Sequence, residues 1–159
     1  MIEVFLIFLP AYVANSFPVI LGGSVPIDEL IGARVFGKHK TLLGFVSGIS
    51  AGIITAYLIS PYTPLPFREA FMLGIITAIG AIVGDLVGSY IKRRYGMKEG
   101  SEFLLDHIFF IVVAVSFVLA VNREVINLVD ALLFIALTFF IHKGANIVAH
   151  RTGLKSVPW

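Results

Sequence analysis

Long hydrophobic runs separated by short polar segments make up most of this chain. The hydrocarbon core of a bilayer is about 30 Å thick, and an α-helix of roughly 20 apolar residues crosses it. Five runs have about this length, and turn-forming residues such as Gly, Pro and Asn lie between them. The runs cover residues 1–21, 41–59, 68–91, 104–121 and 125–141, the last with room to continue as helix toward His150. We therefore predict an all-α integral membrane protein with five transmembrane helices.

Composition supports this class. Hydrophobic residues are 58% of the 159 and charged residues only 14%, whereas soluble domains have about 45–50% and about 25%. We expect one membrane domain over residues 1–159, and no nucleic-acid partner. Cysteine is absent, which excludes disulfides, thiolate zinc sites and cysteine nucleophiles. The N-terminus lacks the positively charged start of a secretory signal peptide, so the first run is expected to remain as a span.

The cations predict the orientation. Ten of the twelve Lys and Arg residues fall in the loop after the first run, the loop after the third run and the C-terminal tail, and the other two are Arg68 and Arg123. Short loops rich in Lys and Arg stay in the cytoplasm. We predict an N-terminus outside the cell, a cytoplasmic C-terminus, and a multi-pass protein of the cell membrane whose two long polar loops face the cytoplasm.

Asp85 lies inside the third hydrophobic run, where a carboxylate is costly. Ionisable groups in a span usually face the bundle interior or a watery cavity, and they mark function. Asp85, Ser89 and Lys92 follow one another at helical spacing, so they share a helix face near the cytoplasmic end. The alternative is a purely structural ion pair of Asp85 with Lys92 or Arg93.

A second carboxylate, Asp106, stands at the start of the fourth run. Because consecutive spans are antiparallel, the two acids are expected at neighbouring cytoplasmic helix ends, in a shallow cavity. Carboxylate and phosphate oxygens are the ligands that Mg²⁺ prefers. We predict that Asp85 and Asp106 bind Mg²⁺ beside a phosphate. The alternative for Asp106 is a charge that complements the helix N-terminus.

The loop after the first run is rich in glycine and cations, with Gly22-Gly23 and Lys40 among them. Glycine allows close backbone approach to a ligand, and cations bind phosphates. Thr41 is also placed to cap the second span. Asn15, near the inner end of the first span, needs a polar partner. The alternative is an ordinary cytoplasmic loop.

Two further patterns concern the helix faces. Glycines recur every fourth residue at 44, 48 and 52 and again at 80, 84 and 88, which is typical of closely packed membrane helices. These helices are expected to touch each other or a second protomer in a homodimer. His142 and Asn146 share a face of the last span. They could line the same cavity, but from sequence we favour an interfacial His142 with a solvated tip.

Together these motifs resemble the CDP-diglyceride synthase family. The C-terminal part of the pattern comprises Gly84-Asp85, Ser89, Lys92-Arg93, Lys98 and Leu105-Asp106-His107. The N-terminal part is similar to the archaeal branch, the CDP-archaeol synthases, and comprises Ala14-Asn15, Gly22-Gly23, Pro26-Ile27-Asp28, Phe36-Gly37, Lys40-Thr41 and Gly44. The chain departs from the bacterial and eukaryotic pattern at Asp106-His107, where those enzymes have Asp-Arg.

The resemblance implies a Mg²⁺-dependent cytidylyl transfer in phospholipid biosynthesis. CTP and an isoprenoid ether lipid phosphate, 2,3-bis-O-geranylgeranyl-sn-glycerol 1-phosphate, would give CDP-archaeol and pyrophosphate. Catalytic roles would fall to Asp85, Asp106 and Lys92, with the two acids as metal ligands. The implied substrate-binding residues are Asn15, Asp28, Lys40, Thr41, Ser89, Arg93 and Lys98. A small transporter or channel with an acidic site is the alternative. Five spans do not divide into the repeated halves usual in transporters.

The predicted orientation can be tested by cysteine labelling, because the chain has no cysteine of its own. A single cysteine at Lys98 should resist a membrane-impermeant thiol reagent in intact cells, and one at Arg68 should react. Labelling at position 98 with protection at position 68 would reverse the topology.

Overall fold

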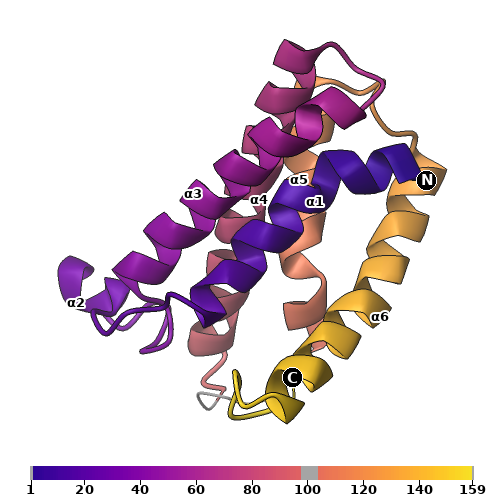
Figure 1. Ribbon diagram of the computed structural model, residues 1–159. Helices are drawn as coiled ribbons and strands as arrows, with labels where there is room; N and C mark the ends of the chain where they lie inside the picture. Colours follow the sequence, from indigo (N-terminus) through magenta and orange to yellow (C-terminus); the bar gives the residue numbers. More distant parts are fainter. Residues whose placement is uncertain (1, 98–103, 159) are drawn as a thin grey trace.

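The computed structural model describes residues 2–97 and 104–158, and helices provide their regular structure (Figure 1). In these ranges no strand forms, and a single isolated bridge joins Pro26 to Thr41. The all-α prediction is therefore confirmed. The α-helices are α1 (Ile2–Ser16), α2 (Ile27–Ile31), α3 (Leu42–Ile59), α4 (Phe67–Arg94), α5 (Phe109–Val121) and α6 (Leu128–Arg151), and the 3-10 helices are Phe17–Val19, Ser60–Tyr62 and Leu104–His107.

Four of these helices are long and apolar enough to cross a membrane: α1 and α3, each with the 3-10 turn that follows it, α4 and α6. α4 has 28 residues, about 42 Å of helix, and so extends beyond a bilayer core. α5 has only 13 residues, about 20 Å, which is shorter than that core. The count of five spans remains a prediction, with α5 as the short member.

The starts of the fourth and the last predicted helix differ by several residues from the structure. The fourth run was expected to be one helix from residue 104, but Ile108 has φ −128° and ψ −19°, which separates a 3-10 turn from α5. Asp106 consequently lies in that turn. The last helix begins at Leu128, not near Val125, because Asn127 caps it by accepting a hydrogen bond from the N–H of Asp130 at 2.8 Å. Asparagine is among the best N-cap residues.

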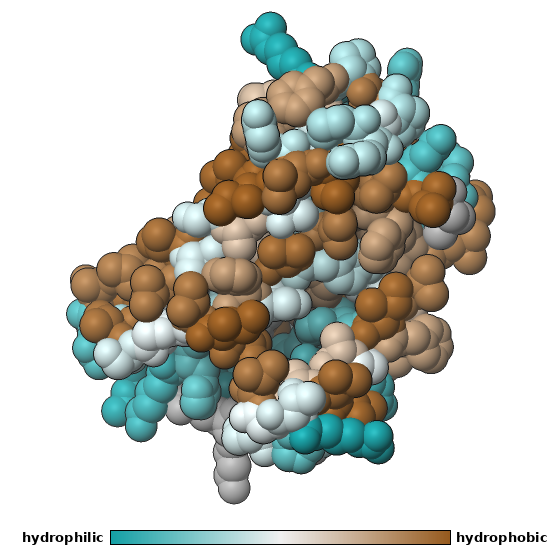
Figure 2. Space-filling model, viewed as in Figure 1, coloured by the Kyte–Doolittle hydropathy of each residue, from teal (hydrophilic) through white to brown (hydrophobic). Residues whose placement is uncertain are grey.

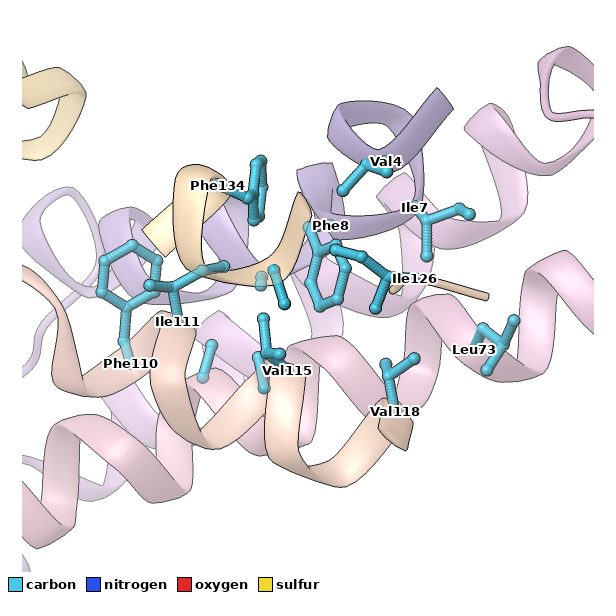
Figure 3. Packing of buried hydrophobic residues seen from close by; sticks show 14 residues of the cluster. Val4, Ile7, Phe8, Leu73, Phe110, Ile111, Val115, Val118, Ile126 and Phe134 are labelled. Atoms are coloured by element: carbon cyan, nitrogen blue, oxygen red, sulfur yellow. The ribbon is translucent and has the colours of Figure 1, made fainter. Parts of the chain in front are cut away.

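α4 is central, packing against α1, α3 and α5. Aromatic side chains join α1, α5 and α6 in the main core (Figure 3). Phe8, Phe110 and Phe134 are buried there, and the rings of Phe8 and Phe134 are 5.1 Å apart. α6 makes few close backbone approaches to its neighbours, so its attachment relies on these large rings. That spacing leaves room between α6 and the other helices for the cavity described below.

The periodic glycines pack helices together within one chain. A Cβ atom built on Gly48 would lie 2.6 Å from the carbonyl oxygen of Ala14, and one on Gly52 would lie 2.5 Å from the Cβ of Ala78. On α4, a Cβ on Gly80 would lie 2.7 Å from the Cα of Ala114. The predicted close packing is confirmed, and it joins α3 to α1 and α4, and α4 to α5.

The surface has a hydrophobic band between two hydrophilic ends (Figure 2). Large apolar side chains are exposed along α3 and α6, including Ile54, Leu58, Leu133 and Phe140. Monomeric soluble proteins rarely expose such extended apolar surface, whereas a lipid bilayer solvates it. The band supports a multi-pass membrane protein. α4 and the C-terminal segment finish at the same end of the bundle (Figure 1), and their last residues include the cations Lys92, Arg93, Arg94, Arg151 and Lys155.

Gly80→Ala is expected to destabilise the bundle, because its new methyl group would meet the backbone of Ala114. The loss should be about 1–3 kcal/mol, as for other overpacked sites, and a lower Tm in detergent would show it. Gly144→Ala is the matched control, since nothing lies within 4 Å of its Cβ position in α6. Equal Tm values for the two variants would contradict the packing argument.

Candidate active site

A cavity of about 630 Å³ opens at the cation-rich end of the bundle, within the usual range for small-molecule sites. Its walls come from the end of α1, the segment before α3, the second half of α4, the 3-10 turn before α5, the end of α6 and the residues after α6. Figure 2 shows hydrophilic residues recessed between hydrophobic ones near this end. The charged residues in the lining are Lys40, Asp85, Lys92, Arg93, Asp106 and Lys155.

Asp85 forms an ion pair with Lys40. The ammonium lies 2.6 Å from Oδ1 and 2.5 Å from Oδ2. About a third of the Asp85 side chain and a quarter of the Lys40 side chain are exposed, and both residues line the cavity. From sequence, the structural alternative was an ion pair of Asp85 with Lys92 or Arg93 of the same helix. The structure instead pairs Asp85 with Lys40, which is 45 residues away in sequence.

The backbone around Lys40 explains how the loop delivers this lysine. The N–H of Ile27 donates to the carbonyl of Lys40 at 2.7 Å, and the N–H of Leu42 donates to that of Val25 at 3.0 Å. Thr41 caps α3 by accepting from the N–H of Gly44 at 3.1 Å, as predicted. The loop therefore enters α3 in a fixed conformation, with Lys40 directed at α4.

Asp106 forms the second ion pair, with Lys92. The Lys92 Nζ and Asp106 Oδ2 atoms are 2.6 Å apart, and both side chains are largely buried. This contact joins the last turns of α4 to the 3-10 turn before α5. The two acids thus line one cavity from different elements, and each has its own lysine.

Asp28 has a different position from the other predicted substrate-binding residues. Its carboxylate accepts hydrogen bonds from the backbone N–H groups of Val35, Phe36 and Gly37 at 3.1, 2.9 and 2.8 Å. Burial by itself raises the pKa of Asp28, but the three donors and the positive charge of Arg93 together lower it below its ordinary value. Phe36 and Gly37 line the cavity and Asp28 does not, so its carboxylate supports the wall from behind.

Asn15 finds its partner on α6. Its amide Nδ2 donates to Nε2 of His142 at 3.3 Å, and the His142 ring packs on Phe110 and His107, with centroids 5.0 and 5.5 Å away. His142 and Asn146 both line the cavity. The interfacial position that we favoured for His142 from sequence is therefore wrong. The helical spacing of the pair was the signal for the correct alternative.

The two carboxylates fit a divalent metal ion only if a bound substrate supplies further oxygen ligands. Among residues 2–97 and 104–158, no group of three or more His, Asp or Glu side chains is placed to hold a metal. Mg²⁺ is commonly bound by one or two carboxylates, with substrate phosphates and water completing six oxygen ligands. Asp85 and Asp106 match that arrangement, with both acids on one cavity.

The structure brings together most of the predicted site residues. Eight line the cavity: Asn15, Lys40, Thr41, Asp85, Ser89, Lys92, Arg93 and Asp106. The Ser89 hydroxyl donates to the backbone carbonyl of Asp85 at 3.0 Å. Lys98 lies outside the described residues. Lys155 was not predicted, because the turn that returns it to the cavity leaves little signal in sequence.

Known proteins match this chain over nearly its whole length. The family model described as CarS-like, CDP-archaeol synthase, matches residues 1–159. A CDP-archaeol synthase of Pyrococcus furiosus is 41% identical, covering 99% of this chain and 98% of the relative. One of Archaeoglobus fulgidus is 38% identical, covering 96% and 94%. A solved structure, described as an intramembrane enzyme for archaeal membrane lipid biosynthesis, superposes with a TM-score of 0.78 at 30% identity, covering 92% and 94%.

Asp28→Asn is expected to loosen the cavity wall, because a neutral amide replaces the acceptor of three backbone hydrogen bonds. Such bonds to a charged group contribute about 1.5–3 kcal/mol each, so amide exchange in residues 33–38 should accelerate tenfold or more in hydrogen–deuterium exchange. Glu29→Gln, at the exposed neighbouring position, is the control. Unchanged exchange in Asp28→Asn would show that the loop holds without this carboxylate.

The lowered pKa of Asp28 also sets the pH range of this support. A carboxyl whose pKa is depressed by folding stabilises the folded state fully above its unfolded value, about 3.9, and loses this contribution as the pH falls through the lower folded value. Protonation of Asp28 should thus not weaken this support at any pH above about 4, which hydrogen–deuterium exchange of residues 33–38 at pH 4.5 and 7 would check.

Proposed function

This chain belongs to the family of CDP-archaeol synthases, and we propose that it transfers the cytidylyl group of CTP to an archaeal lipid phosphate, 2,3-bis-O-geranylgeranyl-sn-glycerol 1-phosphate. A phosphate oxygen of the lipid would attack the α-phosphorus of CTP. The bond from that phosphorus to the oxygen that bridges it to the β-phosphate would break, so that CDP-archaeol forms and pyrophosphate leaves. The observation that supports this most directly is one cavity, at the end of a bundle of apolar helices, in which two carboxylates and four cationic side chains converge.

The cations suit two anionic substrates. The lipid phosphate is already ionised near neutral pH, so no strong protein base is needed, and the demand is to hold two polyanions together. Phosphoryl chemistry depends mainly on positioning and electrostatic stabilisation. We assign phosphate contacts to Lys40, Lys92 and Arg93, which line the cavity, and polar contacts to Asn15, Thr41 and Ser89.

The ion pairs prepare the site before substrate binds. Lys40 and Lys92 hold Asp85 and Asp106 in place, and each lysine is a flexible cation that can turn from its carboxylate to a nearby phosphate. Mg²⁺ bound by the two carboxylates and substrate phosphates would neutralise negative charge on the phosphates during transfer. Asp28 acts indirectly, by fixing the backbone that carries Phe36 and Gly37.

The proposed orientation follows the positive-inside rule, with the cavity facing the cytoplasm, where CTP is made. The lipid head group would enter the cavity while its two isoprenoid chains stay in the bilayer beside the apolar band. A transport function would not explain the match to a family of synthases, nor the cluster of cations around the two acids.

Purified protein with CTP, Mg²⁺ and the lipid phosphate should release pyrophosphate and form a CDP-lipid in equal amounts. Asp85→Asn and Asp106→Asn should each abolish turnover across a Mg²⁺ series. The double variant should cost little more, because residues that act as a unit are not additive. Glu124→Gln, exposed and outside the cavity lining, should remain active.

Thermal stability must be measured on the same samples, since Asp85→Asn leaves Lys40 with a neutral partner. Near-normal activity and unchanged Mg²⁺ dependence in Asp85→Asn would remove this residue from the catalytic site. Loss of activity only through unfolding would make the ion pair with Lys40 structural. Absence of pyrophosphate release by the unsubstituted protein would overturn the proposed function itself.

A further inference from the structure

The residues after α6 turn back over the cavity. Gly153, with φ 79°, ends the helix in the left-handed conformation that glycine adopts readily. The N–H groups of Leu154 and Lys155 then donate to the carbonyl of Ala149 at 2.9 and 3.1 Å. His150 adds a contact between its Nδ1 and the carbonyl oxygen of Lys155, 3.1 Å apart. The chain is thus reversed by a fixed turn, and residues 154–157 line the cavity.

This turn directs the Lys155 side chain inward. Its ammonium donates to Oδ1 of Asn146, at 3.1 Å, and Asn146 is only 8% exposed. Both residues line the cavity together with the two ion pairs. Lys155 is therefore positioned in part by a contact with a neutral amide in the cavity wall.

We propose that Lys155 is a substrate-binding residue, which the C-terminal turn delivers to the cavity to contact a phosphate oxygen. The inference rests on the proposed function and adds a residue of the C-terminal tail to its site. The same ammonium chemistry suits a phosphate of CTP or the phosphate of the lipid, and the experiment below distinguishes the two.

The electrostatics of the cavity favour an anionic ligand near Lys155. Burial lowers the pKa of this lysine, as do the charges of Lys40 and Lys92, while Asp85 and Asp106 raise it, and the net effect is a lowered pKa. An ammonium group among these charges is chemically suited to a phosphate oxygen, and perturbed groups of this kind cluster at functional sites.

Lys155→Met keeps much of the side-chain volume and removes the charge. With both substrates varied independently, it should raise KM for one of them about tenfold, as expected for one lost hydrogen bond between charged groups. A higher KM for CTP identifies the nucleotide as the partner, and a higher KM for the lipid identifies the lipid phosphate. Lys155→Arg should recover most of the loss.

Two further variants separate the effect of the Lys155 charge from the effect of the turn that positions it. Lys143→Met removes an exposed lysine of α6 that does not line the cavity, and both KM values should stay unchanged. Gly153→Ala keeps the ammonium but strains the turn at φ 79°, so it should raise the same KM as Lys155→Met by a smaller factor.

The inference is overturned if the unsubstituted enzyme is fully active and the Lys155→Met variant has the same two KM values, whether or not its kcat falls. An unsubstituted protein that does not transfer cytidylyl groups would instead remove the proposed function on which the inference rests. A Tm equal to that of the unsubstituted protein confirms that Lys155→Met has folded.

Discussion

The ion pair between Lys40 and Asp85 is the contact on which the architecture of the site depends. An isolated carboxylate inside a membrane bundle costs several kcal/mol unless a partner and water compensate it. Here the partner comes from a different segment, which must be held against α4 for the charge to be tolerated. The loop between α1 and α3 is thereby fixed as one wall of the cavity. The capping contact of Thr41 holds that wall at its junction with α3, and the hydrogen bonds to Asp28 hold it within the loop.

Close helix packing makes this contact possible. Gly48 and Gly52 let α3 approach α1 and α4 to distances that a methyl group would prevent, and helices that approach so closely bring their ends, and the polar groups on them, into one space. α6 is attached differently, through large aromatic rings such as Phe134. The tight side of the bundle positions the ion pairs, and the wide side supplies the volume of the cavity. Small residues and large ones therefore have complementary roles in one fold.

Much of the fold could be predicted from sequence, because length, hydropathy and glycine spacing are local properties. The site was predictable as far as its acids and cations, since a buried carboxylate such as Asp85 is informative by itself. The ion-pair partner of Asp85 was not predictable from the sequence. Asp85 binds Lys40 and not a residue of its own helix, because the choice depends on how α3 lies against α4. Helix ends were missed for a related reason: the cap at Asn127 and the 3-10 turn holding Asp106 are set by individual hydrogen bonds and dihedral angles.

The balance of charge in the cavity links this structure to its chemistry. Each carboxylate already has a lysine at ion-pair distance, and Arg93 and Lys155 add further positive charge to the same lining. In a partly buried space of low effective dielectric, these charges act more strongly on a ligand than they would in water. Under the proposed function, the polyphosphate of CTP is an anion that they would attract. A site of this kind discriminates by charge first. The apolar surface beside it is suited to retaining the chains of a lipid whose head group supplies that charge.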